Sequence, residues 1–490
     1  MSHFEKLPPP EMSKSQTTWL MVSLTAYCLF FFFLAVRKYV LFTDNAADTA
    51  IIQHAFWGSI HGKFFPCFSL EMSFFGDKAS YILILLWPIY WLFPSTETLL
   101  FLQSIFITLA GVPIYFIALR SLRDHFAALA ITFAFLLFPT IVSQHVNTIH
   151  DTQFIVVFLL WAFYFYEGGD FRLFALFCGL SCLGKENVPL TIMVFGVYAA
   201  LQRRSWRWVV LPILMGAVTM LAEFKWLMPW LRNGKPYRSF TYFGELGQSP
   251  MDVVRTAITR PLMFARVLFS GDRIMYLIQL LEPVGLFLPF VSLAVIFILP
   301  DLVLNLLVEN AALRVIRWHY NLTVGAFLFV ALIFSIRKIV PWLERRYGAA
   351  RYATGFGILF LCLSTCHWVF WLNLNDYQQP PQYAALQEAL AMVPESDSVL
   401  APQTMIAHVA NRWHFTCLSH VLINERAPEN IFKYKFVILD LNERRPTWNV
   451  PQEVVRAFGA NPDYELVFNQ QNVLVFRRKG EDILVGKPAW

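Results

Sequence analysis

Residues 43–80 read TDNAADTAIIQHAFWGSIHGKFFPCFSLEMSFFGDKAS and follow the first long apolar run of the chain. Apolar residues recur at helical spacing between positions 44 and 62, which predicts a short amphipathic helix at a membrane surface, with its two aspartates one turn apart on one side. A solvated loop explains the same pattern, and the residues alone leave both interpretations open. A charge-poor chain keeps ionisable groups where they have a use, and this stretch collects Asp44, Asp48, Gln53, His54, Trp57, Glu71, Asp77 and Lys78.

The composition places the chain in a broad class. Of its 490 residues, 57% are hydrophobic and 15% are charged, whereas an average soluble domain has about 25% charged residues. The 48 Phe and 16 Trp suit lipid-facing and interfacial surfaces. We therefore expect a polytopic integral membrane protein in contact with membrane lipids. The formal net charge of +6 suits anionic headgroups and phosphate ligands, and it is too diffuse to indicate a nucleic-acid partner.

Cysteines and short motifs exclude several kinds of site. The seven Cys lie mostly within apolar runs, and Cys178 and Cys182 are one helical turn apart, which favours packing. No CxxC or Cys/His spacing typical of a metal site occurs, so we assign no metal ligands and no cofactor, and a divalent cation stays open. P-loop, GxGxxG, GxSxG and HExxH motifs are also missing from the sequence, so nucleotide hydrolysis, dinucleotide binding and the common hydrolases lack support.

Long apolar runs predict the membrane domain. Residues 18–36 can cross a bilayer, and no small-residue cleavage site follows them, so they read as an anchor. Residues 1–16 form a polar cytoplasmic lead, and residues 81–93, ended by Pro94, read as a re-entrant or interfacial helix. The prediction is about eleven spans within a membrane domain at 17–372. The ten later runs are 96–118, 126–142, 154–166, 173–183, 188–201, 208–226, 275–290, 291–307, 322–336 and 353–372.

Lys and Arg in the short loops orient the chain. With the N-terminus inside, the loop at 43–80 lies outside, together with segments 145–153 and 185–187 and the segment from Arg314 to Tyr320. The basic loop at 227–274 also falls outside, which is expected of a face that binds phosphate. Polar groups at the outer helix ends therefore converge on one face. We expect one pocket there containing Asp48, Asp77, His150, Lys185 and His319.

The composition changes after residue 373, where apolar runs shorten and Pro, Asn, Asp and Glu become frequent. We predict that residues 379–490 form a small α/β domain on the outer side. Asp440 ends a buried strand, and a strand-end cap is favoured over a site carboxylate. Strands are predicted at 398–401, 436–441, 465–468 and 473–476, and helices at 383–392 and 405–412.

Two motifs near the start resemble those of a known family. The residues from Asp48 to Trp57, DTAIIQHAFW, resemble the pattern FDxGIFDQALW, with Gln53 in place of its second Asp and His54 in place of its Gln. The family pattern GDHFSP–ILLLLAPLY is similar to GDKAS at 76–80 followed by residues 82–90, with Lys78 in place of His.

Further motifs follow in the same order. His150 matches the His of FDFHPE, although Thr148 replaces its Asp and the Glu is lost. GKENVPL at 184–190 matches CKEDAAL, and His319-Tyr320 matches an outer HY before a span. VPESDSVLAP and FVILD occur in the C-terminal part. The chain therefore resembles the large bacterial and archaeal family of predicted membrane proteins, with a domain of unknown function, that belongs with the GT-C glycosyltransferases.

The resemblance implies a GT-C-like fold and activity. Such enzymes transfer a sugar from a lipid-linked donor, usually a polyprenyl phosphate, at the outer membrane face. For this chain it implies an envelope acceptor, a multi-pass protein in a bacterial-type inner membrane, and an extracytoplasmic C-terminal domain. Asp48 would be the catalytic base, with Asp44 as the second candidate, because inverting transfer needs a carboxylate to accept the acceptor proton.

The resemblance also implies the substrate-binding residues. Lys185 would balance the leaving phosphate, helped by Lys78 or His319. Glu186 would orient Lys185 or bind sugar hydroxyls. The remaining members of the substrate-binding set are Trp57, Asp77, His150 and Tyr320.

Two other classes of function remain open. A lipid or sugar-lipid transporter would place ionisable groups near the bilayer midplane, whereas here they cluster at one face. A non-catalytic protein of envelope assembly would need no phosphate site, so convergence of Asp48 and Lys185 in one pocket distinguishes it from an enzyme.

Overall fold

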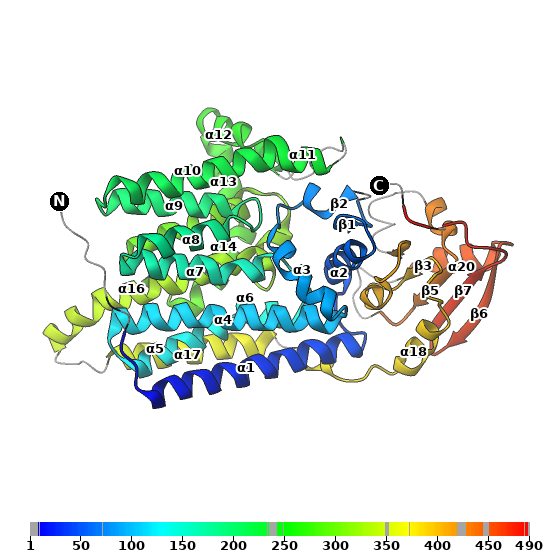
Figure 1. Cartoon of the computed structure of the whole chain (residues 1–490), viewed down its shortest axis with the longest axis horizontal. Helices are drawn as coiled ribbons and strands as arrows, with labels where there is room; N and C mark the ends of the chain where they lie inside the picture. Colours follow the sequence, from blue (N-terminus) through cyan, green and yellow to red (C-terminus); the bar gives the residue numbers. More distant parts are fainter. Residues whose placement is uncertain are drawn as a thin grey trace.

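A helical bundle carries a small mixed α/β domain at one end (Figure 1). Glu71 of the opening stretch and part of the predicted loop at 227–274 lie outside the described residues. The computed structural model describes residues 8, 10–70, 72–232, 234, 243–247, 249–347, 352–371, 373–418, 428–443, 450–484 and 486–488.

Four helical segments of the described chain are long and apolar enough to cross a membrane. They are α1 (Lys14–Val40), α4 (Thr96–Leu122), the segment Trp206–Leu231, and α16 (Leu322–Tyr347) with the turn before it. Within the third segment, α10 (Trp206–Ala222) continues through the π-helical turn η2 (Glu223–Leu227) into α11 (Met228–Leu231). A fifth span arises if the bent pair α5 (His125–Leu136) and α6 (Pro139–Val146), which meet at 56°, crosses as one unit.

The other apolar runs are also helical, but their helices are shorter. The segment predicted to be re-entrant or interfacial is α3. The total of about eleven spans therefore stays a prediction, because several runs are too short for a perpendicular crossing. The shorter helices are α3 (Ile82–Leu92), α7 (Thr152–Gly168), α8 (Phe171–Ser181), α9 (Val188–Leu201), α14 (Gly271–Leu281), α15 (Leu299–Leu307) and α17 (Tyr352–Trp371).

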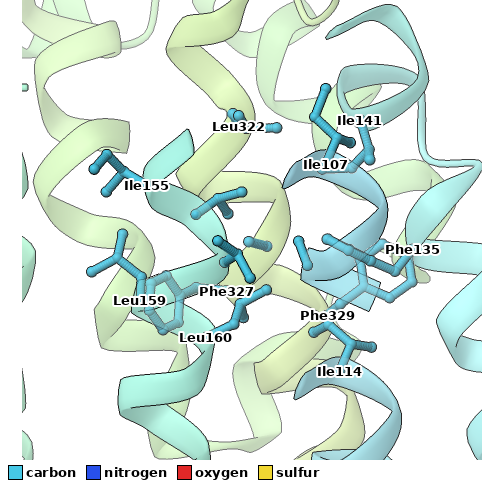
Figure 2. Packing of buried hydrophobic residues seen from close by; sticks show 14 of the residues in the cluster. Ile107, Ile114, Phe135, Ile141, Ile155, Leu159, Leu160, Leu322, Phe327 and Phe329 are labelled. Atoms are coloured by element: carbon cyan, nitrogen blue, oxygen red, sulfur yellow. The ribbon is translucent and has the colours of Figure 1, made fainter. Parts of the chain in front are cut away.

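The centre of the bundle is formed by α4, α7 and α16. Figure 2 shows Ile107 and Ile114 of α4, seven residues and therefore two turns apart, on the side of Phe329, whereas Phe327 lies towards α7. Leu159 and Leu160 of α7 complete the contact, and all of these side chains are fully buried. Lipid tails are as apolar as these residues, so close van der Waals packing holds the helices together.

The opening stretch folds differently from the amphipathic surface helix that its pattern predicts. It does form a helix, α2 (Ala47–Ile60), but α2 is buried on both sides. Ile52 and Phe56 belong to the core of the bundle, whereas Ala46 and Ala50 belong to an apolar cluster of the C-terminal domain. The predicted helix is confirmed and the solvated loop is wrong. The exposed polar face expected of an amphipathic helix is not found, because the C-terminal domain covers it.

Close contacts fasten the segment after α2. A Cβ on Gly58 would lie 2.2 Å from Pro66 Cγ, so only glycine lets α2 pack directly against β1 (Pro66–Cys67) of the hairpin. That hairpin closes with β2 (Met72–Ser73), and the 3₁₀ turn η1 (Phe74–Gly76) follows. The Nε of Arg232 donates a 2.7 Å hydrogen bond to the Gly76 carbonyl, which ties this turn to the end of α11.

The C-terminal domain contains a five-stranded mixed sheet in the order β4-β3-β5-β7-β6. β3 pairs in parallel with β4 and β5, and β7 pairs antiparallel with β5 and β6. The strands are β3 (Val399–Ala401), β4 (Phe415–Cys417), β5 (Phe436–Asp440), β6 (Tyr464–Gln470) and β7 (Val473–Arg478), and the helices are α18 (Tyr383–Ala391) and α20 (Gln452–Ala460).

Four of these strands and α18 coincide with sequence predictions. β4 was missed, because three residues carry too little alternation. The helix predicted at 405–412 is only the 3₁₀ turn η11 (Ile406–Val409). Asp440 accepts hydrogen bonds from the backbone N–H of Asn442 (2.9 Å) and from Gln382 Nε2 (3.2 Å), as expected of a strand-end cap.

Polar contacts join the two domains around the end of α1 and along α2. The rings of Tyr39 and His408 stack with centroids 4.0 Å apart, and His408 Nε2 lies 3.0 Å from the Tyr39 carbonyl oxygen. Gln53 Nε2 donates to Asn411 Oδ1 (3.0 Å). Because residues of both domains satisfy each other's buried polar groups, the C-terminal domain is fixed above one end of the bundle.

Candidate functional site

A cavity of about 460 Å³ lies where the bundle meets the segment that leads into the C-terminal domain. Its walls come from the corner before α2, from α2 itself, from the loops before α3, α7 and α16, and from the linker after α17. Most of the lining side chains are polar. They are Asn45, Asp48, Lys78, Gln144, Asn147, Thr148, His150, Arg317, Trp318, His319, Tyr320, Asn373 and Asp376.

Asp48 projects from the first turn of α2 and keeps 40% of its side chain exposed. His150 Nε2 lies 3.6 Å from Asp48 Oδ2 and 2.9 Å from Thr148 Oγ1. The Ile149 N–H donates to Thr49 Oγ1 (3.2 Å), which fixes the loop of His150 against α2. The site therefore holds an accessible carboxylate beside an imidazole whose loop is anchored to the same helix.

Next to His150, on from Asp48, the site contains a row of aromatic rings. The rings of His150 and His319 stack with centroids 3.6 Å apart, and the ring of Tyr320 lies 3.9 Å from that of His319. Lys185 Nζ lies 4.9 Å from the centre of the Tyr320 ring, a cation–π distance. Lys185 thus approaches the cavity from behind Tyr320.

Glycine allows the approach of the loop that carries Lys185. A Cβ on Gly184 would lie 2.5 Å from Cγ1 of Ile155 in α7. No larger residue fits between this turn and α7 without displacing one of them.

Lys78 and Asp151 form the ionic part of the site. Burial lowers the pKa of Lys78, but the carboxylates of Asp48 and Asp151 outweigh this and raise its pKa above the usual range. Asp151 is buried and accepts a hydrogen bond from Ser80 Oγ. Burial raises the pKa of Asp151, and Lys78 and Lys185 lower it further than burial raises it. Lysine and aspartate are therefore both ionised at neutral pH.

Two predicted residues lie beside the cavity and not among the described residues that line it. Glu186 Oε2 accepts a 3.4 Å hydrogen bond from the Ala79 N–H, and burial raises the pKa of Glu186 against the effect of Lys185. Asp77 is partly exposed next to Lys78 in the chain. Of the five residues expected to share one pocket, Asp48, His150 and His319 line it, whereas Lys185 and Asp77 are not among the described lining residues.

Asp44 and Trp57 lie elsewhere. Asp44 is buried, and its Oδ1 lies 3.6 Å from Lys38 Nζ, so it is held in an ion pair before α2 begins. Trp57 follows Asp48 by nine residues, half a turn out of phase at 100° per residue, and so points to the opposite side of α2. There it packs on Trp413 (ring centroids 4.7 Å) and lines a separate cavity of about 340 Å³ against the C-terminal domain.

Several lining residues escaped the sequence analysis. Arg317 adds a cation, and its carbonyl accepts a 2.8 Å hydrogen bond from Gln144 Nε2. The only signal for Arg317 was its place in the polar segment from Arg314 to Tyr320. Asn147 lies in the predicted outer segment 145–153 but was not singled out, because an amide in a loop is a common surface residue. Asp376 carried no signal, because a carboxylate in a domain linker is equally common.

Within the described part of the chain, no three His, Cys, Asp or Glu side chains are grouped so that they could hold a metal ion. Two carboxylates near the cavity are engaged with other groups: Asp44 with Lys38, and Asp151 with Ser80. The chemistry available from these side chains is that of an acid–base group facing fixed positive charge.

The buried imidazole of His150 predicts a pH-dependent stability. Burial lowers the pKa of His150 from 6.5 to about 4, against the opposing effect of Asp48. Between these pH values the unfolded state binds more protons, so His150 destabilises the fold as pH falls from 6.5 towards 4, by up to about 3 kcal/mol. We expect His150→Gln to reduce the loss of thermal stability between pH 7.5 and 4.5.

The comparison between wild type and variant isolates this residue. Burial also lowers the pKa values of His54 and His408 to about 4, but both groups are present in both proteins. Parallel pH profiles of the unfolding temperature would show that His150 does not carry the effect.

Comparison with known proteins places the chain in a family. The family model described as "Predicted membrane protein (DUF2079)" matches residues 37–462. The chain belongs to the DUF2079 family. The matched region includes every lining residue of the cavity and extends through most of the C-terminal domain. No curated protein matches the chain significantly.

Solved structures identify the fold of this DUF2079 protein. ArnT from Cupriavidus metallidurans bound to undecaprenyl phosphate aligns with a TM-score of 0.50 and 12% identity, over 94% of this chain and 98% of the ArnT chain. The apo form of the same enzyme aligns with a TM-score of 0.49 and 13% identity, over 93% and 98%. The DUF2079 protein therefore shares the fold of ArnT, a GT-C-like fold. Its family description and its long apolar helices make it a multi-pass membrane protein.

Proposed function

We propose that this DUF2079 protein transfers a sugar from a polyprenyl-phosphate-linked donor to an envelope acceptor at the outer membrane face. The observation that carries the proposal is one cavity of about 460 Å³ in which the accessible carboxylate of Asp48 meets the cations Lys78 and Arg317. A carboxylate can accept the proton of the acceptor hydroxyl, and cations can stabilise the negative charge of a phosphate leaving group. The ArnT structure contains undecaprenyl phosphate, which supports a lipid of this class as the donor.

The proposed reaction assigns one role to each group. Asp48 accepts the proton of the acceptor hydroxyl as that oxygen bonds to the anomeric carbon. The bond between this carbon and the phosphate oxygen breaks, and the electron pair leaves with the phosphate. Lys78 and Arg317 balance the resulting charge, and Lys185 adds positive charge from behind Tyr320. His150, which is neutral above pH 4, contacts Asp48 and orients it.

Asp44 is the weaker candidate for the base. Its buried ion pair with Lys38 keeps the carboxylate from an acceptor. A transporter would hold its ionisable groups near mid-bilayer, whereas the lining residues here lie at helix ends next to the linker. The decisive assay incubates the purified protein in nanodiscs with polyprenyl-phosphate sugars and an envelope lipid fraction, and follows donor consumption. Lipid movement without a glycosylated product would favour the transporter.

The proposed orientation predicts opposite labelling of two engineered cysteines. Gln387, on α18, and Glu344, near the end of α16, are both exposed and lie in different domains. We expect an impermeant maleimide to label Gln387→Cys in intact cells and Glu344→Cys only after permeabilisation. The wild-type chain measures the background of its seven cysteines. If only Glu344→Cys were labelled in intact cells, the true orientation would be the opposite of the one proposed here.

A further inference from the structure

The residues that line the cavity fall into two chemically different groups, which we call its two halves. One half contains Lys78 and Arg317 with the stacked rings of His150 and His319. The other half contains neutral amides and one carboxylate, Asn45, Asn147, Asn373 and Asp376. Amides donate and accept hydrogen bonds and suit hydroxyl groups, whereas the cationic half suits phosphate.

Lys38 holds the second half together. It is 3% exposed, and its Nζ donates to the Val146 carbonyl (2.8 Å) and lies 3.5 Å from Asn147 Oδ1. The same atom lies 3.6 Å from Asp44 Oδ1 and 4.0 Å from Asp376 Oδ2. One buried cation thus joins the α6 end, the corner before α2 and the linker after α17, and these three segments form this half of the cavity wall.

Asp376 is fixed in place but remains accessible. Its Oδ1 accepts a 2.8 Å hydrogen bond from Asn373 Nδ2, its carbonyl accepts one from Thr43 Oγ1 (2.5 Å), and 22% of its side chain is exposed. Lys38 is shared between Asp44 and Asp376, so one lysine faces two carboxyl groups. An accessible carboxylate in such a cluster accepts hydrogen bonds from hydroxyls and repels another carboxylate.

We propose that Asp376, with the amides of Asn147 and Asn373, forms the sugar-binding half of the cavity and selects a sugar with free hydroxyls and no carboxylate. The inference concerns the binding of the sugar. It rests on the proposed function only in linking this binding to the sugar-transfer reaction. A site built to hydrogen-bond hydroxyl groups rejects a ligand that leaves those groups unpaired, and like charges add to the rejection. Asp376 acts here as a specificity-determining residue, outside the proton-transfer step.

Native mass spectrometry of the protein in nanodiscs tests the inference. The probes are a polyprenyl-phosphate hexose and the matching hexuronate, which differ only at the carboxylate. We expect the wild type to bind the hexose at least tenfold more tightly. Asp376→Asn should reduce this ratio several-fold, because it removes the repulsion and weakens hydroxyl binding. Asn375→Ala, in the same exposed turn but not among the described lining residues, should leave the ratio unchanged.

The outcomes separate the two proposals. Equal binding of the two lipids, no binding of either, or the same ratio in wild type and Asp376→Asn would overturn the sugar-selection inference. The expected binding ratios without any donor consumption would retain it and refute the transfer reaction. Donor consumption with no preference between the two lipids would retain the reaction and refute the assignment of Asp376.

Discussion

Asp48→Asn is expected to abolish sugar transfer, with donor binding and folding retained. The amide keeps the shape of the carboxylate but cannot accept a proton, and loss of a general base costs about 10²–10⁴-fold in rate. The side chain is 40% exposed and lies 3.6 Å from His150. Asp151 still balances Lys78 in the variant, so we expect the fold to be retained. Donor turnover measures the loss, and native mass spectrometry of bound lipid measures what is retained.

Asp44→Asn is the matched control, because it removes the same charge four residues earlier. Asp44 is buried against Lys38, so we expect its substitution to lower thermal stability and to leave the proton-transfer step in place. Full donor turnover in Asp48→Asn, together with its loss in a folded Asp44→Asn, would transfer the role of base to Asp44.

Lys78→Ala is expected to weaken donor binding and turnover together. The Lys78 side chain lines the cavity, and nearby carboxylates keep it charged. Removing one partner of a desolvated, charge-assisted contact costs about 2–5 kcal/mol. Because the phosphate is present in both the ground state and the transition state, KM should rise while kcat/KM falls by about 10²-fold or more. Steady-state kinetics with the polyprenyl-phosphate donor measure both quantities.

Two lysine variants provide the comparison. Lys78→Arg keeps the positive charge and should recover part of the donor affinity, although the guanidinium has a different shape. Lys185→Ala should have a smaller effect than Lys78→Ala, since Lys185 meets the cavity through the Tyr320 ring. Unchanged donor affinity in a folded Lys78→Ala would exclude this lysine from the phosphate site.

The sequence predicted the helices well where apolar runs are long. The run predicted at 96–118 lies within α4, because lipid-facing and core-facing residues are both apolar. The burial of α2 between the two domains was not predictable from the residues of α2 alone. Its helical spacing is visible, but its burial depends on contacts with Ile406 and Val409 of the C-terminal domain, more than 350 positions later in the chain.

The residues of the candidate site were predictable where they are charged, because charged side chains are rare in a membrane protein. Asp48 and Lys78 stand out as charged residues at helix ends. Trp57 was grouped with Asp48 because both belong to one motif, yet nine residues on a helix place them on opposite faces. Contacts with Lys38 help to hold Asn147 and Asp376 at the cavity, and no local sequence pattern reveals them.

The double-sided burial of α2 limits how the protein can be recombined. In a chimera that exchanges everything after residue 372, α2 would face a foreign partner across Ala46 and Ala50, and Gln53 would lose Asn411. The same exchange would replace Asp376, one wall of the cavity. The membrane bundle and the C-terminal domain therefore do not form interchangeable modules. Residues on the two sides of α2 must change together if the helix is to stay packed between the two domains.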